Sequence, residues 1–591
     1  MLTEAVHPGD VSQRDRRKMT AYLKRTLTPQ EARAALARFS SDSRGRSIEW
    51  IVAAAERNSA PPKSLRLPDD SVIDLLVELA GSDLLADREL RRLIASRCDP
   101  RVLSRLHDYP SSTRGRGGDR SKATAVAQRK WHPGKSWATY FVRSIRMPLS
   151  FAGWKSEAAL PDTLDVEPCV KVPPLADFQR ELFHRLVEVL NSAEDRNRAI
   201  LTLPTGAGKT RTAVEALLSW RQSREDRPIV LWIAQSDELC EQAVQSIREV
   251  WFDLGHGDSS FRESLTIGRL WGSRNAVPWE CGAVVASIQK LFAAARGDGS
   301  ELTAESLEAL GEQTGVVVID EAHRALAPSY GSVLNALGFN FRQRSNKTAL
   351  IGLTATPRRT SDDETRRLRR RFHDNILNVP SLGEDPIQSL RGQGVLARIK
   401  VESLDYDADR IELGSSASHA QYYEDFEDIH PDILRRLGEE HLRNRRLIER
   451  LLALDPAWPV LVFACSVQHA QAMTSLLQRG GRSSACVLGT TRPATRRATI
   501  ERFRSGQLSV LCNYGVLTTG FDAPSVRCVV VARPTASPIL YEQMVGRGMR
   551  GPEFGGTTEC LVIDVDDNIR WRNQPATVQY EALEQEMRFV R

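Results

Sequence analysis

The sequence predicts an α/β protein with two doubly wound parallel-sheet domains behind a mainly helical N-terminal accessory domain. Three observations support this prediction. The chain has 591 residues, enough for about three to five domains. From Leu175 onward, short runs that are apolar throughout alternate with helical stretches, as expected for parallel strands covered on both faces. Before Leu175, apolar residues recur at spacings of three and four, which is typical of helices that bury one face.

Composition excludes several classes of protein. Hydrophobic residues make up 41% and charged residues 26% of the chain, which is ordinary for a globular protein. No stretch approaches the ~20 apolar residues of a membrane-spanning helix, so we expect no membrane partner. Residues 1–18 lack the apolar core of a secretory signal, and we expect a cytoplasmic protein. The nine cysteines form no CxxC pair, which argues against a zinc module.

Domain boundaries are expected where Pro- and Gly-rich segments interrupt the periodic patterns. The predicted divisions are a helical accessory domain at 1–108, a basic aromatic segment and linker at 109–174, a first α/β domain at 175–385, a helical connector at 386–455 and a second α/β domain at 456–591. The apolar runs Ala199–Leu203 and Val316–Ile319 are typical strands of the first α/β domain, and Val460–Phe463 is typical of the second.

A glycine-containing loop follows the first expected strand. It reads Pro-Thr-Gly-Ala-Gly-Lys-Thr over residues 204–210 and precedes a helix-forming stretch. Its glycines let backbone N–H groups approach phosphate oxygens, Lys209 would reach the terminal phosphates, and the Thr210 hydroxyl would bind Mg²⁺. Leu203 stands where the strict pattern has glycine. The residues assigned to nucleotide binding here are Thr205, Gly206, Ala207, Gly208, Lys209 and Thr210.

Two adjacent carboxylates end a later apolar run, in Val316-Val-Val-Ile-Asp-Glu-Ala-His323. They fall at the carboxyl end of the strand, where open α/β sheets bind ligands. Asp320 would hold Mg²⁺, usually through water, and Glu321 would orient and deprotonate the attacking water. Together with the loop, the pair predicts a site that hydrolyses ATP with Mg²⁺.

These motifs resemble superfamily 2 helicases and translocases of the DEAH-box type, over about residues 175–564. The segments that carry the resemblance, in order, are Lys209–Thr210, Asp320–His323, Thr354–Thr356, Gly520–Asp522 and Gln543–Arg550. The resemblance implies two RecA-like domains with ATP between them and nucleic acid across the top. Within the superfamily the chain is most similar to the RadD-like, XPB-like and type I restriction-motor branch, which generally acts on DNA. It departs from that branch in lacking a four-cysteine module and a nuclease motif.

The resemblance also implies roles for individual residues. Arg547 and Arg550 match the arginine fingers of the second domain, which stabilise transition-state charge once the cleft closes. The other nucleotide-binding positions implied are Gln179, which matches an adenine-reading glutamine, and Gly520, Asp522 and Gln543. Implied nucleic-acid contacts are Gln235, Gln289, Thr354, Thr356 and Thr518. A structural role stays open for Thr354 and Thr356, which could merely cap the following helix.

Residues 101–150 carry the positive charge of the chain. They hold eleven Lys and Arg against two acidic residues, a balance of +9, whereas the whole chain has +6 and the remainder therefore −3. Two roles are open: the bases bind phosphates while the aromatic rings stack on exposed bases, or the segment is a solvated linker whose rings dock on the motor. The candidates for nucleic-acid contact are Arg129, Lys130, Trp131, Lys135 and Trp137.

The sequence therefore predicts a nucleic-acid-dependent ATPase that acts as a DNA helicase or double-strand DNA translocase, in DNA repair or phage defence. One alternative is an RNA-dependent helicase, because no residue can be assigned to reading a 2'-hydroxyl. Another is an ATP-switched scaffold subunit of a larger DNA-processing complex. Residues 1–108 are candidates for binding protein partners.

Overall fold

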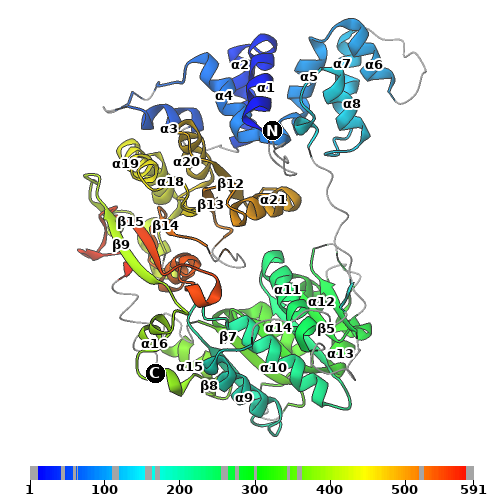
Figure 1. Ribbon diagram of the computed structural model, residues 1–591, viewed down its shortest axis with the longest axis vertical. Coiled ribbons are helices and arrows are strands. Elements are labelled where there is room, and N and C mark those ends of the chain that lie inside the picture. The colour runs from blue at the N-terminus through cyan, green and yellow to red at the C-terminus, as the bar shows by residue number, and fades with distance from the viewer. Residues whose placement is uncertain are drawn as a thin grey trace.

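The computed structural model describes residues 11–40, 47–57, 61–62, 64–109, 119–153, 163–166, 174–254, 264–272, 274, 278–297, 302–341, 346–355, 362–426, 428–517, 523 and 525–580. Figure 1 shows an N-terminal helical domain at the top, the second α/β domain in the middle and the first α/β domain at the bottom. The predicted α/β fold class with a helical N-terminal domain is confirmed. Within these ranges, no helix combines the length and apolarity that crossing a membrane requires.

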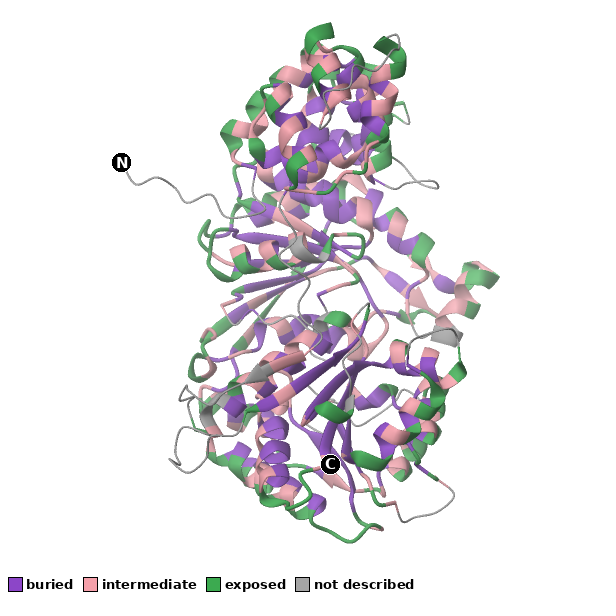
Figure 2. Ribbon diagram, turned by 90° about the vertical axis from the view of Figure 1, so that its right-hand side faces the viewer, coloured by how far each residue is buried: buried purple, intermediate pink, exposed green. Residues whose placement is uncertain are grey.

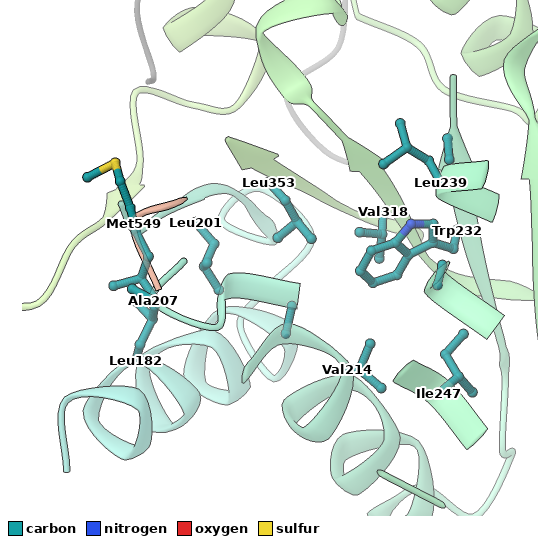
Figure 3. Close-up of a cluster of buried hydrophobic side chains, with 14 of the residues drawn as sticks. Leu182, Leu201, Ala207, Val214, Trp232, Leu239, Ile247, Val318, Leu353 and Met549 are labelled. Atoms are coloured by element: carbon teal, nitrogen blue, oxygen red, sulfur yellow. The ribbon is translucent and has the colours of Figure 1, made fainter. Parts of the chain in front are cut away.

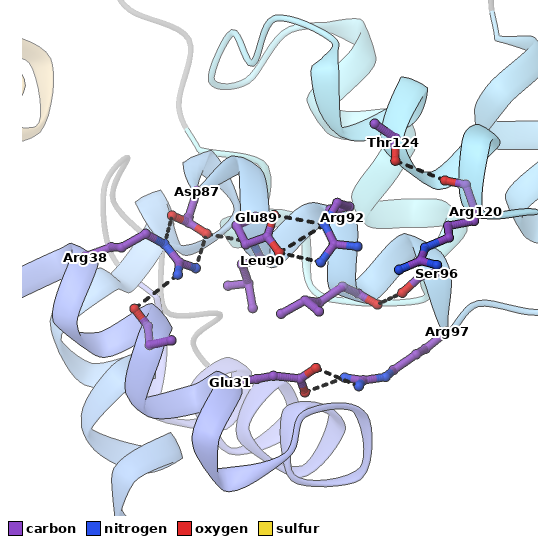
Figure 4. A network of polar contacts seen from close by, with 12 residues as sticks. Glu31, Arg38, Asp87, Glu89, Leu90, Arg92, Ser96, Arg97, Arg120 and Thr124 are labelled. Atoms are coloured by element: carbon purple, nitrogen blue, oxygen red, sulfur yellow. Dashed lines mark hydrogen bonds and ion pairs between the residues drawn. The ribbon is translucent and has the colours of Figure 1, made fainter.

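The N-terminal domain consists of short helices. They are α1 (Gln13–Thr26), α2 (Pro29–Ser40), α3 (Ile48–Ala55), α4 (Asp69–Ala80), α5 (Arg88–Ser96), α6 (Pro100–Asp108), α7 (Asp119–Gln128) and α8 (Ser136–Ser144), with 3-10 turns at Gly81–Ala86 and Leu149–Ala152. Their apolar faces form one core, in which Met19, Leu76 and Phe141 are fully buried. Two ion pairs connect α2 to the ends of α5: Arg38 binds Asp87 at 2.8 Å and Glu31 binds Arg97 at 2.7 Å (Figure 4).

Helices α7 and α8 correct the prediction for residues 109–174. That range was expected to be a linker, yet Val126 on α7 and Phe141 on α8 are buried in the N-terminal core. Phe151 in the following 3-10 turn is buried there too. The helical domain therefore extends at least to Ala152.

The lower α/β domain is built on an eight-stranded sheet in the order β1-β4-β5-β3-β6-β7-β2-β8. Its strands are β1 (Thr163–Val166), β2 (Arg198–Thr202), β3 (Ile229–Ala234), β4 (Leu265–Leu270), β5 (Ala283–Ser287), β6 (Thr314–Asp320), β7 (Ala349–Thr354) and β8 (Ile376–Leu377). Only the pairing of β1 with β4 is antiparallel among these described strands. Parallel neighbours need crossover connections, so helices cover both faces.

The helices of this first RecA-like domain are α9 (Asp177–Leu190), α10 (Lys209–Ser223), α11 (Asp237–Leu254), α12 (Ile288–Arg296), α13 (Ala304–Gln313), α14 (Pro328–Ala336), α15 (Asp362–Arg371) and α16 (Pro386–Gly392). Figure 2 shows buried residues concentrated on the strands beneath these helices. One core cluster of the sheet includes Trp232 and Val318, which are fully buried, as well as Met549 of the second α/β domain (Figure 3). The hydrophobic core is therefore continuous across the junction of the two domains.

The middle α/β domain has a six-stranded parallel sheet in the order β12-β13-β11-β14-β15-β9 and a small sheet in the order β10-β16-β17. Its strands are β9 (Arg398–Leu404), β10 (Ile411–Glu412), β11 (Val460–Phe463), β12 (Ser484–Leu488), β13 (Val510–Tyr514), β14 (Cys528–Val531), β15 (Glu559–Val565), β16 (Ile569–Trp571) and β17 (Gln574–Pro575). Its helices are α17 (Ala417–Phe426), α18 (Pro431–Glu439), α19 (His441–Leu452), α20 (Val467–Arg479), α21 (Pro493–Arg504) and α22 (Pro538–Val545).

The range 386–455 differs from the predicted helical connector. It does contain α18 and α19, but β9 pairs in parallel with β15 along its whole length and forms the edge of the second sheet. Exposed Arg398 and Lys400 lie on β9, as charged side chains often do on edge strands. Most of this range is therefore part of the second RecA-like domain.

The N-terminal domain packs on α20 of the second RecA-like domain (Figure 1). Ala472 and Leu476 of α20 belong to the N-terminal hydrophobic core. Polar contacts surround them: Gln468 donates to the carbonyl of Ser40 at 3.0 Å, and Arg479 pairs with Glu56 at 3.1 Å. The two domains thus share a core, and the N-terminal domain is attached to the second half of the α/β pair.

Candidate active site

The loop between β2 and α10 has the backbone conformation that its glycines predict. Gly206 has φ +89° and Gly208 has φ +80°, in the left-handed region that glycine enters without strain. Gly208 is the N-cap of α10, so the first N–H groups of that helix open toward the loop. A Cβ on Gly208 would lie 2.3 Å from Nε2 of Gln179. The positive φ therefore favours glycine at this position, and a Cβ would also displace the Gln179 amide.

Gln179 braces this loop from α9. Its Nε2 donates to the carbonyl of Ala207 at 3.1 Å, and its Oε1 accepts from the N–H of Ala176 at 3.0 Å. The side chain is 4% exposed. Gln179 was predicted to read adenine; here both ends of its amide are committed to holding the phosphate loop against α9.

The two carboxylates lie at the end of β6. Glu321 has φ +53°, a strained conformation for a residue with a side chain, and its N–H donates to Asp320 Oδ1 at 3.0 Å. Nδ1 of the buried His323 lies 3.3 Å from Glu321 Oε2 and 3.4 Å from Oγ1 of Thr354. His323 therefore joins the end of β6 to the end of β7, where Thr354 is fully buried.

The surroundings of the two carboxylates shift their pKa values in opposite directions. Burial, and then the charge of Glu321, raise the pKa of Asp320, while Lys209 opposes them. Burial alone would raise the pKa of Glu321, but the hydrogen bond from His323 and the charges of Lys209 and Arg547 outweigh it and lower that pKa. Glu321 is thus held as an anion that can orient water and accept its proton.

The donor set around the loop fits Mg²⁺. Asp320 is buried and Glu321 is partly buried, and burial together with the charge of Glu321 disfavours the anionic form of Asp320, which a divalent cation would favour. The Thr210 hydroxyl and the Asp320 carboxylate would supply oxygen ligands of the kind that Mg²⁺ prefers, and nucleotide phosphates would add others. Within the described ranges, the chain has no cluster of three or more His, Cys, Asp and Glu that could hold a metal by itself.

The second RecA-like domain contacts the loop through the segment after α22. The Thr205 hydroxyl donates to Oε1 of Glu542 at 3.3 Å, and Gly546 lies so close that a Cβ on it would stand 2.4 Å from Thr205 Cγ2. Arg547 donates from Nε to the carbonyl of Gln543 at 3.2 Å, and its charge acts on Glu321 across the junction. The phosphate loop and the arginine segment therefore face each other.

The chain at Leu396 supports the arginine segment. Leu396 and Arg550 form an antiparallel bridge, and the N–H of Ala397 donates to the carbonyl of Met549 at 2.8 Å. An ideal Cβ on Gly206 would meet Leu396 Cδ2 at 3.4 Å and Arg550 N at 3.6 Å. The backbone of Arg550 thus lies directly against the phosphate loop.

Sequence reasoning missed two residues at this junction. Phe554 follows the arginine segment and stacks on Phe178 with ring centroids 6.4 Å apart, beside Gly208. Glu542 binds Thr205 from the other domain. Both residues lie close to Arg547 and Arg550 in the sequence, which was the one hint of their position. Their partners are more than 300 residues away, and such contacts leave no local sequence pattern.

The predicted nucleic-acid residues divide into three groups. Gln235 and Gln289 meet at the carboxyl ends of β3 and β5, where Gln289 Nε2 donates to the carbonyl of Gln235 at 2.8 Å. Thr354 is buried, and its hydroxyl lies 3.4 Å from Nδ1 of His323. Thr356 and Thr518, also predicted to contact nucleic acid, lie outside the described residues, as do Gly520 and Asp522, which were predicted to bind the nucleotide.

The aromatic rings of the basic segment do not lie where nucleic-acid binding was predicted to need them. The Arg129 guanidinium lies 4.6 Å from the ring centre of Trp137 and donates to the carbonyls of His107 at 2.6 Å and of Tyr109. Trp131 packs edge-on against Phe141 within the N-terminal core. These rings therefore support the fold of their own domain instead of standing free for bases or docking on the motor. Lys130 and Lys135 are exposed, and their predicted phosphate contacts stay a prediction.

Comparison with known proteins places these features in a family. Residues 173–359 match a family described as "Type III restriction enzyme, res subunit", and residues 443–551 match "Helicase conserved C-terminal domain". A Saccharomyces cerevisiae protein described as an ATP-dependent helicase, IRC3, is 24% identical over 413 residues, 68% of this chain and 52% of that protein. The type I restriction enzyme EcoAI endonuclease subunit of Escherichia coli is 23% identical over 405 residues, 66% of this chain and 45% of that subunit.

Among solved structures, a fragment of an HsdR subunit of a type I restriction enzyme from Vibrio vulnificus has 20% identity, covers 67% of this chain and 68% of its own, and has a TM-score of 0.42. The chain spans about half the length of the two relatives above. The first matched region contains the phosphate loop and the Asp-Glu-Ala-His sequence, and the second contains the arginine segment. With both regions in this order, the chain belongs to superfamily 2 of the helicases, with relatives among the restriction motors.

Proposed function

We propose that the protein is a nucleic-acid-dependent ATPase that acts as a DNA helicase or double-strand DNA translocase. The observation that carries this proposal is that the arginine segment of the second RecA-like domain lies against the phosphate loop of the first, where Thr205 donates to Glu542 at 3.3 Å. In agreement, Lys209 from the first domain and Arg547 from the second both lower the pKa of Glu321. A site assembled from two domains is complete only while they are in contact. Nucleic acid that spans both domains can therefore control the rate of hydrolysis.

The geometry suggests the following roles. The phosphate loop binds the triphosphate of ATP through backbone N–H groups and Lys209. Mg²⁺, held by Thr210 and Asp320, would neutralise charge on the phosphates. Glu321, anionic and oriented by His323, positions water and accepts its proton. Arg547, with Arg550 beside it, stabilises the charge that develops on the transferred phosphoryl group.

DNA is the favoured substrate. The EcoAI relative is a subunit of a restriction enzyme, and the family matched by residues 173–359 is also named for restriction enzymes. This support comes from similarity to other proteins and not from a residue of this chain. The proposed role in DNA repair or phage defence has the same kind of support. Binding of partner proteins through residues 1–108 stays a prediction. One face of that domain already packs on α20 of the same chain.

The proposal predicts which polymers stimulate ATP turnover. ATPase activity is measured with single-strand DNA, duplex DNA, forked DNA and RNA, and with no polymer. We expect DNA to raise turnover and Lys209→Ala to lower the stimulated rate by about 10²- to 10³-fold, because it removes a cation from the developing phosphate charge. Stimulation by RNA but not DNA would instead identify an RNA-dependent enzyme. Nucleotide binding without turnover, unaffected by Glu321→Gln, would identify a switch.

A further inference from the structure

Exposed bases from two distant parts of the N-terminal domain lie around one turn. The Ser150 hydroxyl donates to Oδ2 of Asp15 at 2.9 Å, which joins the start of α1 to the turn that follows α8. The N–H of Gly134 donates to the carbonyl of Ala152 at 2.9 Å and places Lys135 beside the same turn. We call the exposed bases around this turn the basic edge: Arg14, Lys18, Lys135, Arg143 and Arg146.

The positive charge of the basic edge is not neutralised within the domain. Among the described residues, no carboxylate forms an ion pair with any of these side chains. In contrast, Lys24 binds Asp74 at 3.3 Å and Arg92 binds Glu89 elsewhere in the same domain. Like charges held close together repel one another, which costs stability unless an anion binds them. The basic edge therefore has the charge of a binding site for a polyanion.

The basic edge offers cations without aromatic faces. In the described part of the N-terminal domain, every aromatic residue is buried or only partly exposed. Tyr140 of α8 stacks on Tyr109 with ring centres 4.2 Å apart, and the Arg129 guanidinium covers Trp137. The bases of a single strand bind by stacking on exposed rings, whereas a duplex keeps its bases inside and presents its phosphates. This surface therefore suits the backbone of a duplex better than a single strand.

The basic edge is fixed to the second RecA-like domain. Arg16, next to Asp15 on α1, donates from Nη1 to Oε1 of Gln478 on α20 at 2.8 Å. Gln478 in turn donates to the carbonyl of Ser484 on β12 at 2.7 Å. In Figure 1, α8 lies at the lower side of the N-terminal domain, toward the RecA-like domains. A duplex bound at this edge would therefore be held beside the second RecA-like domain and would move with it.

We propose that the basic edge binds the phosphate backbone of duplex DNA. The inference rests on the proposed function and adds a contact with the polymer outside both RecA-like domains. The guanidinium groups of Arg14, Arg143 and Arg146 bind phosphate oxygens through paired N–H donors, and the two lysines add point charges. Such contacts depend on salt and not on base sequence, because they reach only the backbone.

The salt dependence of duplex affinity tests this inference. Fluorescence anisotropy of a labelled DNA duplex gives the affinity of the full chain over a range of salt concentrations, for the native protein and for Arg143→Gln with Arg146→Gln. Each lost phosphate contact lowers the slope of log affinity against log salt by about one, so we expect a slope less steep by about two. Duplexes of unrelated sequence should lose affinity equally.

A second pair of substitutions and a matched control fix the interpretation. Lys18→Gln with Lys135→Gln leaves the end of α8 intact and should lower the slope by the same amount. Lys24→Gln with Arg92→Gln removes the same charge from surface ion pairs of the same domain, where the two side chains are 30% and 33% exposed, and should keep the native slope. Thermal unfolding followed by circular dichroism checks that each variant is folded.

Two outcomes overturn the inference. A native slope in both basic-edge pairs excludes this edge as a site for DNA and would point to an acidic protein as its ligand. A loss of affinity for single-strand oligodeoxythymidylate without a loss for the duplex excludes the duplex as the ligand. Stimulation of the native ATPase by DNA is measured in parallel, so a native slope with stimulation intact overturns the basic edge alone and leaves the proposed function standing.

Discussion

Replacing Gly546 with alanine is expected to lower nucleic-acid-stimulated ATP turnover by about 10³-fold, the lower end of what an arginine finger contributes. The added Cβ would stand 2.4 Å from Cγ2 and 2.9 Å from Cβ of Thr205, two atoms of a short, β-branched side chain that cannot move far. The arginine segment would then be pushed off the phosphate loop, and Arg547 would lose its position near Glu321. Steady-state ATPase assays at saturating DNA measure this loss.

Two further variants show whether contact between the domains is the cause. Gly489→Ala, in the same domain, adds a Cβ with nothing within 4 Å and should keep the native rate. Thr205→Ser in the Gly546→Ala background removes the nearer clashing atom and keeps the hydroxyl that binds Glu542, so part of the activity should return. Full activity of Gly546→Ala alone would show that this contact has no part in catalysis.

Arg443→Ala is expected to destabilise the second RecA-like domain by about 3 to 5 kcal/mol. Arg443 binds Asp567 through two bonds of 2.6 and 2.9 Å, with side-chain exposures of 0% and 1%, and also donates to the carbonyl of Ala532. Burial by itself would lower the pKa of Arg443, but the charge of Asp567 raises it instead. Without the arginine, Asp567 is left as a buried charge, with the hydroxyl of Tyr406 as its side-chain partner among the described residues.

The free energy of unfolding, from urea titration followed by circular dichroism, measures this effect. Lys400→Ala is the matched control, because the Lys400–Glu559 pair of the same sheet is 66% and 45% exposed and should contribute about 0 to 1 kcal/mol. The double variant Arg443→Ala with Asp567→Ala should recover part of the loss, since it removes the uncompensated charge. A loss below 1 kcal/mol in Arg443→Ala would contradict the account of this pair.

The parts of the fold that were predicted have strong local signals. Runs such as Val316–Ile319 are apolar at every position because the strand is covered on both faces, and this run forms β6. Gly206 and Gly208 were predicted from the chemistry of phosphate binding, and both have the positive φ that requires glycine. Local sequence was sufficient because backbone conformation and burial at these positions follow from neighbouring residues.

The parts that were missed depend on distant partners or weaker patterns. Strand β9, Arg-Ile-Lys-Val-Glu-Ser-Leu, alternates polar and apolar residues as an edge strand does, so it lacks the continuous apolar run that marks a strand covered on both faces. Trp131 and Trp137 lie in a basic segment whose composition resembles a nucleic-acid-binding surface, and only the packing of α7 and α8 shows that they belong to a core. The contact between Thr205 and Glu542 spans 337 residues and leaves no sequence signal.

The most direct test of a site shared by two domains is the single-turnover rate of ATP hydrolysis in Arg547→Ala at saturating DNA. Arg547 lies in the second domain, whereas Lys209 and Glu321 lie in the first. The account predicts hydrolysis about 10³-fold slower with nucleotide affinity nearly retained, and a native rate for Arg527→Ala, an exposed arginine of the same domain. Hydrolysis at the native rate in Arg547→Ala would show that the first domain splits ATP without the second.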